Sequence, residues 1–282
     1  MPVKKIAVIG AGTMGGGIAQ TAAQSGFTVI LEDVNEGHAR AGYTKIAERM
    51  GRRVDEGKTE KSEMEKALAR IEITGRIEEC GDADLIIEAA AENEEVKKKI
   101  FRTLDSLCPP RCIFATNTSC ISVTRLGGAT GRPARFVGMH FMNPAYAMKL
   151  IEVVRGAATS AETISAIRSV SEKMGKVPVV VDDAPGFVSN RVLMPLINEA
   201  IFCLEEGVAS KERIDRVMKL GANHPMGPLE LADFIGLDTC LDILSILRAE
   251  LGEKFRPSPL LRKMVTAGKL GKKSGEGFYV YR

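Results

Sequence analysis

The feature that most constrains this chain is a cluster of glycines directly after a short apolar run near its start. Residues 5–9 read Lys-Ile-Ala-Val-Ile, and they are followed by Gly10, Gly12 and Gly15. An apolar run that ends in glycine is typical of a strand buried on both faces of a parallel sheet. A helical stretch comes next, and a second apolar run, 28–31, follows it. The pattern predicts a strand–helix–strand unit with a glycine-rich turn.

Each glycine of this G-x-G-x-x-G pattern has a mechanical role. Gly10 allows the tight turn, Gly12 lets the backbone approach a pyrophosphate, and Gly15 lets the helix pack closely on the sheet. Thr13 and Met14 begin the helix, whose free N–H groups and positive dipole end favour phosphate. The turn is therefore a candidate dinucleotide site.

Asp33 ends the second strand, at the spacing from the glycines that this motif requires. A carboxylate there accepts hydrogen bonds from the adenosine ribose hydroxyls and repels a 2′-phosphate. The sequence therefore predicts NAD rather than NADP as the cofactor.

Alternating strands and helices continue beyond this unit and predict an α/β fold, a Rossmann-like and mostly parallel sheet. Further strands are expected at 71–74, 85–88, 112–116, 136–139, 149–154 and 177–181. Helices are expected at 94–107 and 161–174, and two more within 35–70, broken near Gly57.

The character of the chain changes after Asp182. Asp183-Ala184-Pro185-Gly186 is a turn and helix-start signal, and helices without strands are expected from there to about residue 268. We therefore expect an NAD-binding domain over 1–183 and an all-helical substrate and dimerisation domain over 184–282. A helix over 236–251 is apolar on more than one face, which fits either a subunit interface or the central helix of a monomeric bundle.

Composition excludes several classes of protein. A net charge of +3 argues against a nucleic-acid-binding protein. The six cysteines form no C-x-x-C pair and the three histidines lie far apart, so we expect reduced thiols and no metal site. The first strand begins almost at once, which leaves no room for a signal peptide, and no apolar run reaches membrane-spanning length. A cytoplasmic location is expected.

His140 and Glu152 are a candidate catalytic pair. His140 is expected directly after a parallel strand, where ligand crevices form in open α/β sheets. Glu152 lies within the next, otherwise apolar strand, and a buried carboxylate needs a partner. A His–Glu pair is a sensible general base, because the carboxylate orients the ring and favours its protonated form.

Two further polar segments stand where loops are expected. Thr116-Asn117-Thr118-Ser119 follows the strand at 112–116, and Asn190 lies in the first turns of the helix after Pro185-Gly186. Considered by themselves, residues of these types at these places are more often turn or cap residues than catalytic ones.

Taken together, the motifs resemble the short-chain L-3-hydroxyacyl-CoA dehydrogenase family, close to its bacterial 3-hydroxybutyryl-CoA type. The resemblance covers essentially the whole chain. It rests on IGAGTMGGGIA (9–19), EAAAENEEVK (88–97), TNTSCISV (116–123), GMHFMNPAYAMKLIEVV (138–154), DAPGFVSNRVLMP (183–195), HPMGPLELADFIGLD (224–238) and GKKSGEGFYVY (271–281).

The resemblance implies roles for individual residues. His140 is the general base on the 3-hydroxyl group and Glu152 orients it, while Ser119 and Asn190 bind the substrate oxygen as it becomes a ketone. The residues that match cofactor-site positions, besides those of the glycine turn, are Glu92, Lys97, Ser119, Asn143 and Lys273.

The implied activity is NAD-dependent oxidation of a (3S)-3-hydroxyacyl-CoA, of short chain length, and the reverse reduction, in a homodimer. Two alternatives stay open at this point. A related group, the L-gulonate 3-dehydrogenases, keeps the fold and the His–Glu pair but oxidises a free sugar acid. Lambda-crystallins use the same scaffold in a structural or binding role.

The sequence departs from the family at the helical arm that contacts coenzyme A. Relatives often carry a Lys-Lys-Gly run there, whereas this chain has Asp55-Glu56-Gly57. Cations at Lys45, Arg49, Arg52 and Arg53 share one helix face. This basic stripe is either a solvated face or, as the resemblance implies, a substitute site for the phosphates of coenzyme A, with Arg49, Arg52 and Arg53 as its binding residues.

Overall fold

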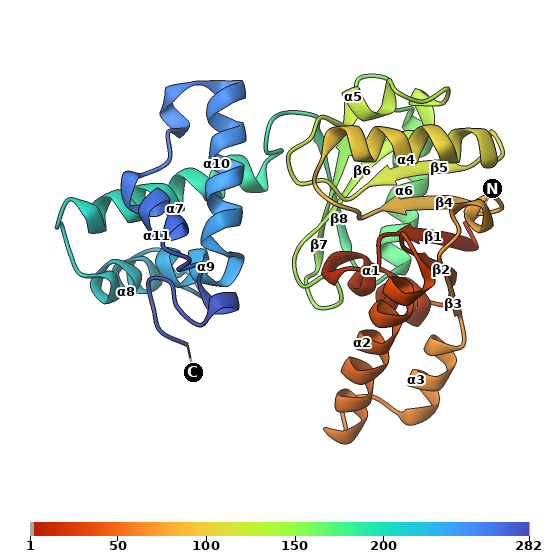
Figure 1. Ribbon diagram of the computed structural model, residues 1–282, viewed down its shortest axis with the longest axis horizontal. Helices are drawn as coiled ribbons and strands as arrows, with labels where there is room; N and C mark the ends of the chain where they lie inside the picture. The colour runs from red at the N-terminus through yellow and green to blue at the C-terminus, as the bar shows by residue number, and fades with distance from the viewer. Residues whose placement is uncertain (1–2, 282) are drawn as a thin grey trace. The chain divides into compact units, whose positions relative to one another are not determined.

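An eight-stranded sheet organises the first part of the protein, whose computed structural model describes residues 3–281 (Figure 1). The strand order is β3-β2-β1-β4-β5-β6-β7-β8. The strands are β1 (Lys5–Ile9), β2 (Thr28–Glu32), β3 (Ile71–Thr74), β4 (Leu85–Glu88), β5 (Ile113–Thr116), β6 (Phe136–Phe141), β7 (Leu150–Arg155) and β8 (Val177–Asp182). The α/β fold expected from the sequence is confirmed.

Strand direction defines where a ligand crevice forms. The strands from β3 to β6 are parallel, β7 runs antiparallel to β6, and β8 is parallel to β7. The chain first moves outward from β1 to β3 and then returns to the other side of β1 with β4. The carboxyl ends of β1 and β4 therefore flank the point where the order reverses, which is the ligand-binding position of open α/β sheets.

Helices cover both faces of this sheet. They are α1 (Thr13–Gln24), α2 (Glu36–Asp55), α3 (Lys61–Leu68), α4 (Glu94–Leu107), α5 (Val123–Gly127) and α6 (Ala161–Lys173). Ile18 of α1 and Ile167 of α6 share one core cluster with Ala115 of β5. The neighbouring Phe114 points to the opposite face, where its ring lies 5.6 Å from that of Phe101 of α4.

The arm formed by α2 and α3 projects away from the sheet beside β2 and β3 (Figure 1). Asn35 caps α2 by accepting a hydrogen bond from the His38 backbone N at 2.9 Å. The helix ends at Asp55, just before Gly57, which adopts a φ of 65°. The predicted break near Gly57 is confirmed, because this left-handed conformation favours glycine.

The chain divides into two compact units, the first ending at Asp183 and the second beginning at Ala184. The second unit is helical, with α7 (Ser189–Glu205), α8 (Lys211–Gly221), α9 (Pro228–Ile235), α10 (Leu237–Leu251) and α11 (Pro259–Thr266). Short 3₁₀ turns, η1 to η4, lie at Ile77–Cys80, Pro133–Arg135, Glu253–Phe255 and Lys272–Ser274. Within residues 3–281, no helix combines the length and apolar character needed to cross a membrane.

Helix α10 contributes to the core of the helical unit. Its buried residues are Leu237, Cys240, Ile243, Leu244 and Leu247. Much of the apolar surface seen in the sequence is therefore already buried within one chain, as expected for a central helix of a bundle.

Candidate functional site

The glycine turn after β1 has the geometry that its sequence predicts. Gly10 adopts a φ of 98°, and a Cβ there would lie 2.7 Å from the Ala89 carbonyl oxygen. A Cβ on Gly15 would lie 1.8 Å from the Gly10 carbonyl oxygen, so only glycine permits this packing of α1. A Cβ on Gly12 would meet no atom within 4 Å. Gly12 therefore borders open space at the N-terminus of α1.

The start of α1 suits a pyrophosphate. Gly12 is its N-cap and offers no side chain to the first N–H groups of the helix. Gly12 and Thr13 are exposed, and Met14 is half-buried. The open approach at Gly12 and the N–H groups behind it fit the phosphates of a dinucleotide.

Asp33 holds the glycine turn in place. Its Oδ2 accepts a hydrogen bond from the Ala11 backbone N at 2.7 Å, and its Oδ1 accepts one from Val34 N at 2.8 Å. His38 Nδ1 lies 3.6 Å from Oδ1. Each carboxylate oxygen has two acceptor positions, so these bonds leave capacity for ribose hydroxyls.

Glu32, beside Asp33, is a buried carboxyl group that the sequence analysis did not single out. Burial, followed by the nearby charges of Asp33 and Glu78, raises the pKa of Glu32 to about 7. The end of β2 therefore has a second carboxyl group, that of Glu32, next to Asp33 of the motif.

His140 and Glu152 form a buried pair, as predicted. They are directly opposite in the antiparallel register of β6 and β7, and His140 Nδ1 lies 2.8 Å from Glu152 Oε2. The predicted strand end was wrong: β6 continues through Phe141, so His140 lies inside the strand rather than after it. The reason is the pairing with β7, which extends β6 beyond Met139.

The turn that carries Ser119 follows β5 and is held by Glu92. Glu92 Oε1 accepts a hydrogen bond from Thr118 Oγ1 at 2.5 Å. The same oxygen accepts bonds from Ser119 N at 2.9 Å and Ser119 Oγ at 3.3 Å. Burial alone would raise the pKa of Glu92, but the Lys97 ammonium and these hydrogen bonds outweigh it and lower that pKa below its ordinary value.

Lys97 is deeply buried at the start of α4. Its ammonium nitrogen lies 2.6 Å from Glu88 Oε1 and 3.2 Å from Glu92 Oε2. The Ala90 carbonyl oxygen accepts from it at 3.4 Å. Glu88 was not singled out from the sequence, although a carboxylate that ends the apolar run Leu-Ile-Ile-Glu needs a buried partner, as Glu152 does.

Asn117 connects the Ser119 turn to the histidine strand. Its Oδ1 accepts a hydrogen bond from the Phe141 backbone N at 2.9 Å, next to His140. The structure thus brings His140, Glu152 and the Ser119 turn together at the carboxyl ends of β5 and β6.

Three further residues were predicted for the site. Asn143 is exposed in the loop between β6 and β7. Asn190, in α7, and Lys273, in η4, belong to the helical unit. Lys273 Nζ donates to Asp238 Oδ2 at 2.6 Å.

The basic stripe on α2 is not uniform. Arg49 is half-buried: its Nε donates to Gln20 Oε1 at 2.6 Å, and its guanidinium lies 4.4 Å from the centre of the Tyr146 ring. Lys45, Arg52 and Arg53 are exposed. Arg49 therefore packs α2 onto its own unit, and the exposed cations are the ones accessible to a phosphate group.

Glu56, at the position where relatives carry lysine, is paired. Lys58 Nζ lies 2.8 Å from Glu56 Oε2, and this hydrogen bond and charge lower the pKa of Glu56. The Lys58 ammonium thus partly neutralises the negative charge that Glu56 places on the arm.

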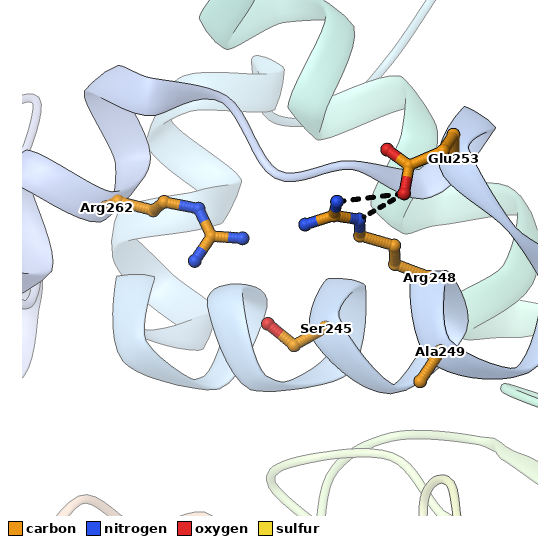
Figure 2. A pocket seen from close by; sticks show the side chains of 5 residues that line it. All are labelled: Ser245, Arg248, Ala249, Glu253 and Arg262. Carbon is orange, nitrogen blue, oxygen red and sulfur yellow. Dashed lines mark hydrogen bonds and ion pairs between the residues drawn. The ribbon is translucent and has the colours of Figure 1, made fainter.

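A shallow depression of about 340 Å³ in the helical unit contains none of the predicted site residues (Figure 2). It is lined by Ser245, Arg248, Ala249, Glu253 and Arg262. Arg248 is paired with Glu253 at 2.8 Å, and Ser245 Oγ donates to the Leu241 carbonyl oxygen. Most of its polar groups are therefore satisfied locally.

Comparison with known families gives two matches that together cover nearly the whole chain. Residues 5–184 match the 3-hydroxyacyl-CoA dehydrogenase NAD binding domain, and residues 186–281 match the 3-hydroxyacyl-CoA dehydrogenase C-terminal domain.

Individual relatives agree with these matches. The chain is 56% identical to a probable 3-hydroxybutyryl-CoA dehydrogenase of Bacillus subtilis, over 100% of this chain and 98% of the relative. It is 54% identical to a protein of the same description from Deinococcus radiodurans, over 98% of this chain and 100% of the relative. The crystal structure of an (S)-3-hydroxybutyryl-CoA dehydrogenase from Ralstonia eutropha superposes with a TM-score of 0.95 at 44% identity, covering 99% of both chains.

Proposed function

The chain belongs to the 3-hydroxyacyl-CoA dehydrogenase family, and from this premise we propose that it oxidises (3S)-3-hydroxybutanoyl-CoA with NAD and catalyses the reverse reduction. The observation that carries the proposal is the buried His140–Glu152 pair beside the Ser119 turn. These groups lie at the edge of the sheet where ligands of such folds bind.

The pair defines the direction of proton transfer. Glu152 holds the Nδ1 side of the His140 ring, so the substrate hydroxyl proton is taken by Nε2. The Glu152 carboxylate then stabilises the imidazolium that forms. Ser119 donates a hydrogen bond to the substrate oxygen as it becomes a ketone.

The cofactor is held at the first turn of the sheet. The backbone from Gly10 to Gly15, including Thr13 and Met14, would hold the pyrophosphate, and Asp33 would accept from the adenosine ribose. Bound NAD supplies the hydride acceptor. Glu92 and Asn143 would complete the cofactor site within the first unit. The Asp33 carboxylate disfavours a 2′-phosphate, so NADH should bind more tightly than NADPH in a direct titration.

The exposed cations of α2 are proposed to bind the phosphates of coenzyme A. Arg52 and Arg53 lie in the last turn of the helix and present planar guanidinium groups that suit phosphate. Arg49 supports them by fixing α2 against Gln20 and Tyr146.

A direct assay tests the activity. NADH consumption is followed with acetoacetyl-CoA, and NADH formation is followed in parallel with L-gulonate and NAD. We expect turnover of the thioester alone, with kcat lowered about 10²-fold or more in His140→Gln and in Glu152→Gln, since each removes part of a positioned general base. Turnover of L-gulonate alone, or NADH binding without any turnover, contradicts the proposal.

We also propose that the protein is a cytoplasmic homodimer. Cys80, Cys108, Cys112, Cys203 and Cys240 carry free thiols, which suits a reducing compartment. Apolar side chains on α7 and α8 are exposed, among them Val192, Val217 and Leu220. Sedimentation equilibrium over a range of protein concentrations tests the dimer, and a monomer at micromolar concentration contradicts it.

A further inference from the structure

The most deeply buried ion pair in the described part of the chain lies beside the site but touches none of its reacting groups. Glu88 ends β4 and is 0% exposed, while Lys97 of α4 is 1% exposed. Removing two charges from water costs several kcal/mol per ion. Stability alone is a weak explanation for such a pair, because apolar residues of the same size often do as well.

The ammonium group of Lys97 has no donor left for a ligand. It has three N–H donors, and three oxygens surround it: Glu88 Oε1, Glu92 Oε2 and the Ala90 carbonyl oxygen. Its side chain is also sealed from solvent. Lys97 can thus influence a bound cofactor or substrate only through the groups it holds.

Two routes lead from Glu88 to the Ser119 turn. In the first, Glu88 fixes Lys97, which lies 3.2 Å from Glu92 Oε2, and the other oxygen of Glu92 binds Thr118 and Ser119. In the second, Thr116 Oγ1 donates to Glu88 Oε2 at 2.7 Å and accepts from Thr118 N at 3.3 Å. Both routes reach Thr118, and the first also reaches Ser119.

The carboxylate of Glu88 accepts three hydrogen bonds in this arrangement. Oε1 also accepts from the Ala90 backbone N at 2.7 Å, so the residue binds β4, β5 and α4 at one point. Parallel register places Glu88 opposite Thr116 on one side and Ile9 on the other. Glu88, at the end of β4, therefore holds the groups that fix the position of the Ser119 turn.

We propose that Glu88 and Lys97 are positioning residues, which hold Glu92 in place as a carboxylate and so fix the Ser119 turn relative to His140. The proposal rests on the proposed function for the part played by Ser119. It assigns Lys97 an indirect role at the cofactor side of the site, and it gives Glu88 a role that its sequence position alone did not indicate.

The decisive variant removes both charges at once. Glu88→Gln combined with Lys97→Met leaves no unpaired buried charge, so it is expected to fold, whereas either single change risks misfolding. Glu92 then loses its cation. We expect kcat with acetoacetyl-CoA to fall about tenfold or more, on the scale of a misplaced group.

A second readout does not depend on turnover. Amide hydrogen exchange of Ser119 and Cys120, whose N–H groups are bound by Glu92, should accelerate about tenfold or more in the double variant without ligand. The matched control is Asp105→Asn combined with Arg132→Met, which removes both charges of another largely buried ion pair, 2.6 Å in length. It should lower stability but leave kcat and the exchange of Ser119 unchanged.

The outcomes separate the two proposals. A folded double variant with wild-type kcat, or with wild-type exchange at Ser119 and Cys120, overturns the positioning role. If the wild-type protein does not reduce acetoacetyl-CoA, the proposed function fails, and the exchange measurement still decides whether Glu88 and Lys97 hold the turn.

Discussion

Two glycines in the same turn illustrate how single residues act for different reasons. Gly10 is required by the fold, since its φ is positive and its Cβ position is occupied by Ala89. Gly12 has a φ of −66° and open space around it, so nothing within the protein forbids a side chain. The reason for glycine at position 12 is therefore the ligand.

We predict that Gly12→Ala leaves the unliganded protein within about 1 kcal/mol of wild-type stability. The added methyl group lies where the pyrophosphate approaches, so the variant should lose stabilisation by NADH. That stabilisation is about 2.7 kcal/mol for the wild type at 100 times the Kd. Denaturant unfolding with and without NADH measures both. Gly10→Ala is the contrast, because it should destabilise the protein even without ligand; equal behaviour of the two variants contradicts this account.

Glu32 makes stability depend on pH. The pKa of Glu32 is about 7 in the folded protein, against 4.5 for an unperturbed glutamate. Between these pH values the folded state therefore binds more protons than the unfolded state. The free energy of unfolding therefore falls as pH rises from about 4.5 to about 7. Glu32→Gln should remove this slope and raise stability at pH 8 by up to about 3 kcal/mol, with little change at pH 4.5. Urea unfolding across this range checks it, and an unchanged slope rules it out.

At the scale of elements, helix α2 has both an arginine that packs inward and the exposed cations that we propose to bind coenzyme A. Arg49 packs inward, whereas Arg52 and Arg53 reach solvent in the last turn. The helix dipole favours cations at the carboxyl end of a helix. It disfavours the negative charge of Glu56, which directly follows α2. The end of α2 thus has two favourably placed cations, Arg52 and Arg53, followed by the acidic residues Asp55 and Glu56.

We predict that Arg52→Glu combined with Arg53→Glu raises the KM for acetoacetyl-CoA about fivefold or more, with kcat nearly unchanged, because the contact is remote from the reacting carbon. Glu56→Lys should lower that KM. Both effects should shrink as salt rises. A thioester without the nucleotide is the control substrate and should not respond. Equal KM values at low salt would show that the stripe is only a solvated face.

At the scale of the whole molecule, two buried carboxylates fix the end of the chain. Asp233 of α9 accepts from the backbone N of Phe278 and of Tyr279, each at 2.8 Å, and from Tyr281 Oη at 3.0 Å. Asp215 of α8 accepts from Tyr279 Oη at 2.8 Å. Burial raises the pKa of Asp233, and these donors oppose the rise. The final segment is thereby attached to the bundle by polar groups.

We predict that Asp233→Asn destabilises the protein by about 2 kcal/mol or more, because an amide N–H replaces an acceptor that faces donors. Guanidinium unfolding measures the change. Glu276→Gln in the same segment is the control: its ion pair with Lys269 is about half exposed, so its loss should cost less than about 1 kcal/mol. Similar losses in both variants would contradict a special role for Asp233.

Much of the fold follows from local sequence. Apolar runs, glycine positions and caps predict the strands, the helices and the dinucleotide turn, since backbone conformation and burial are set by neighbours along the chain. The His140–Glu152 pair was also predictable, because a carboxylate inside an apolar strand requires a nearby partner.

Other features were decided only by tertiary structure. The extension of β6 past Met139 depends on pairing with β7, and the inward packing of Arg49 depends on Gln20 and Tyr146 from distant elements. Glu88 stands at a strand end and Lys97 at a helix start, and nothing in the local sequence indicates that they pair. Only the assembled sheet and helix bury them together. Which side chains are buried and which charges pair depends on the segments that become neighbours in space. The local pattern of the sequence does not specify those neighbours.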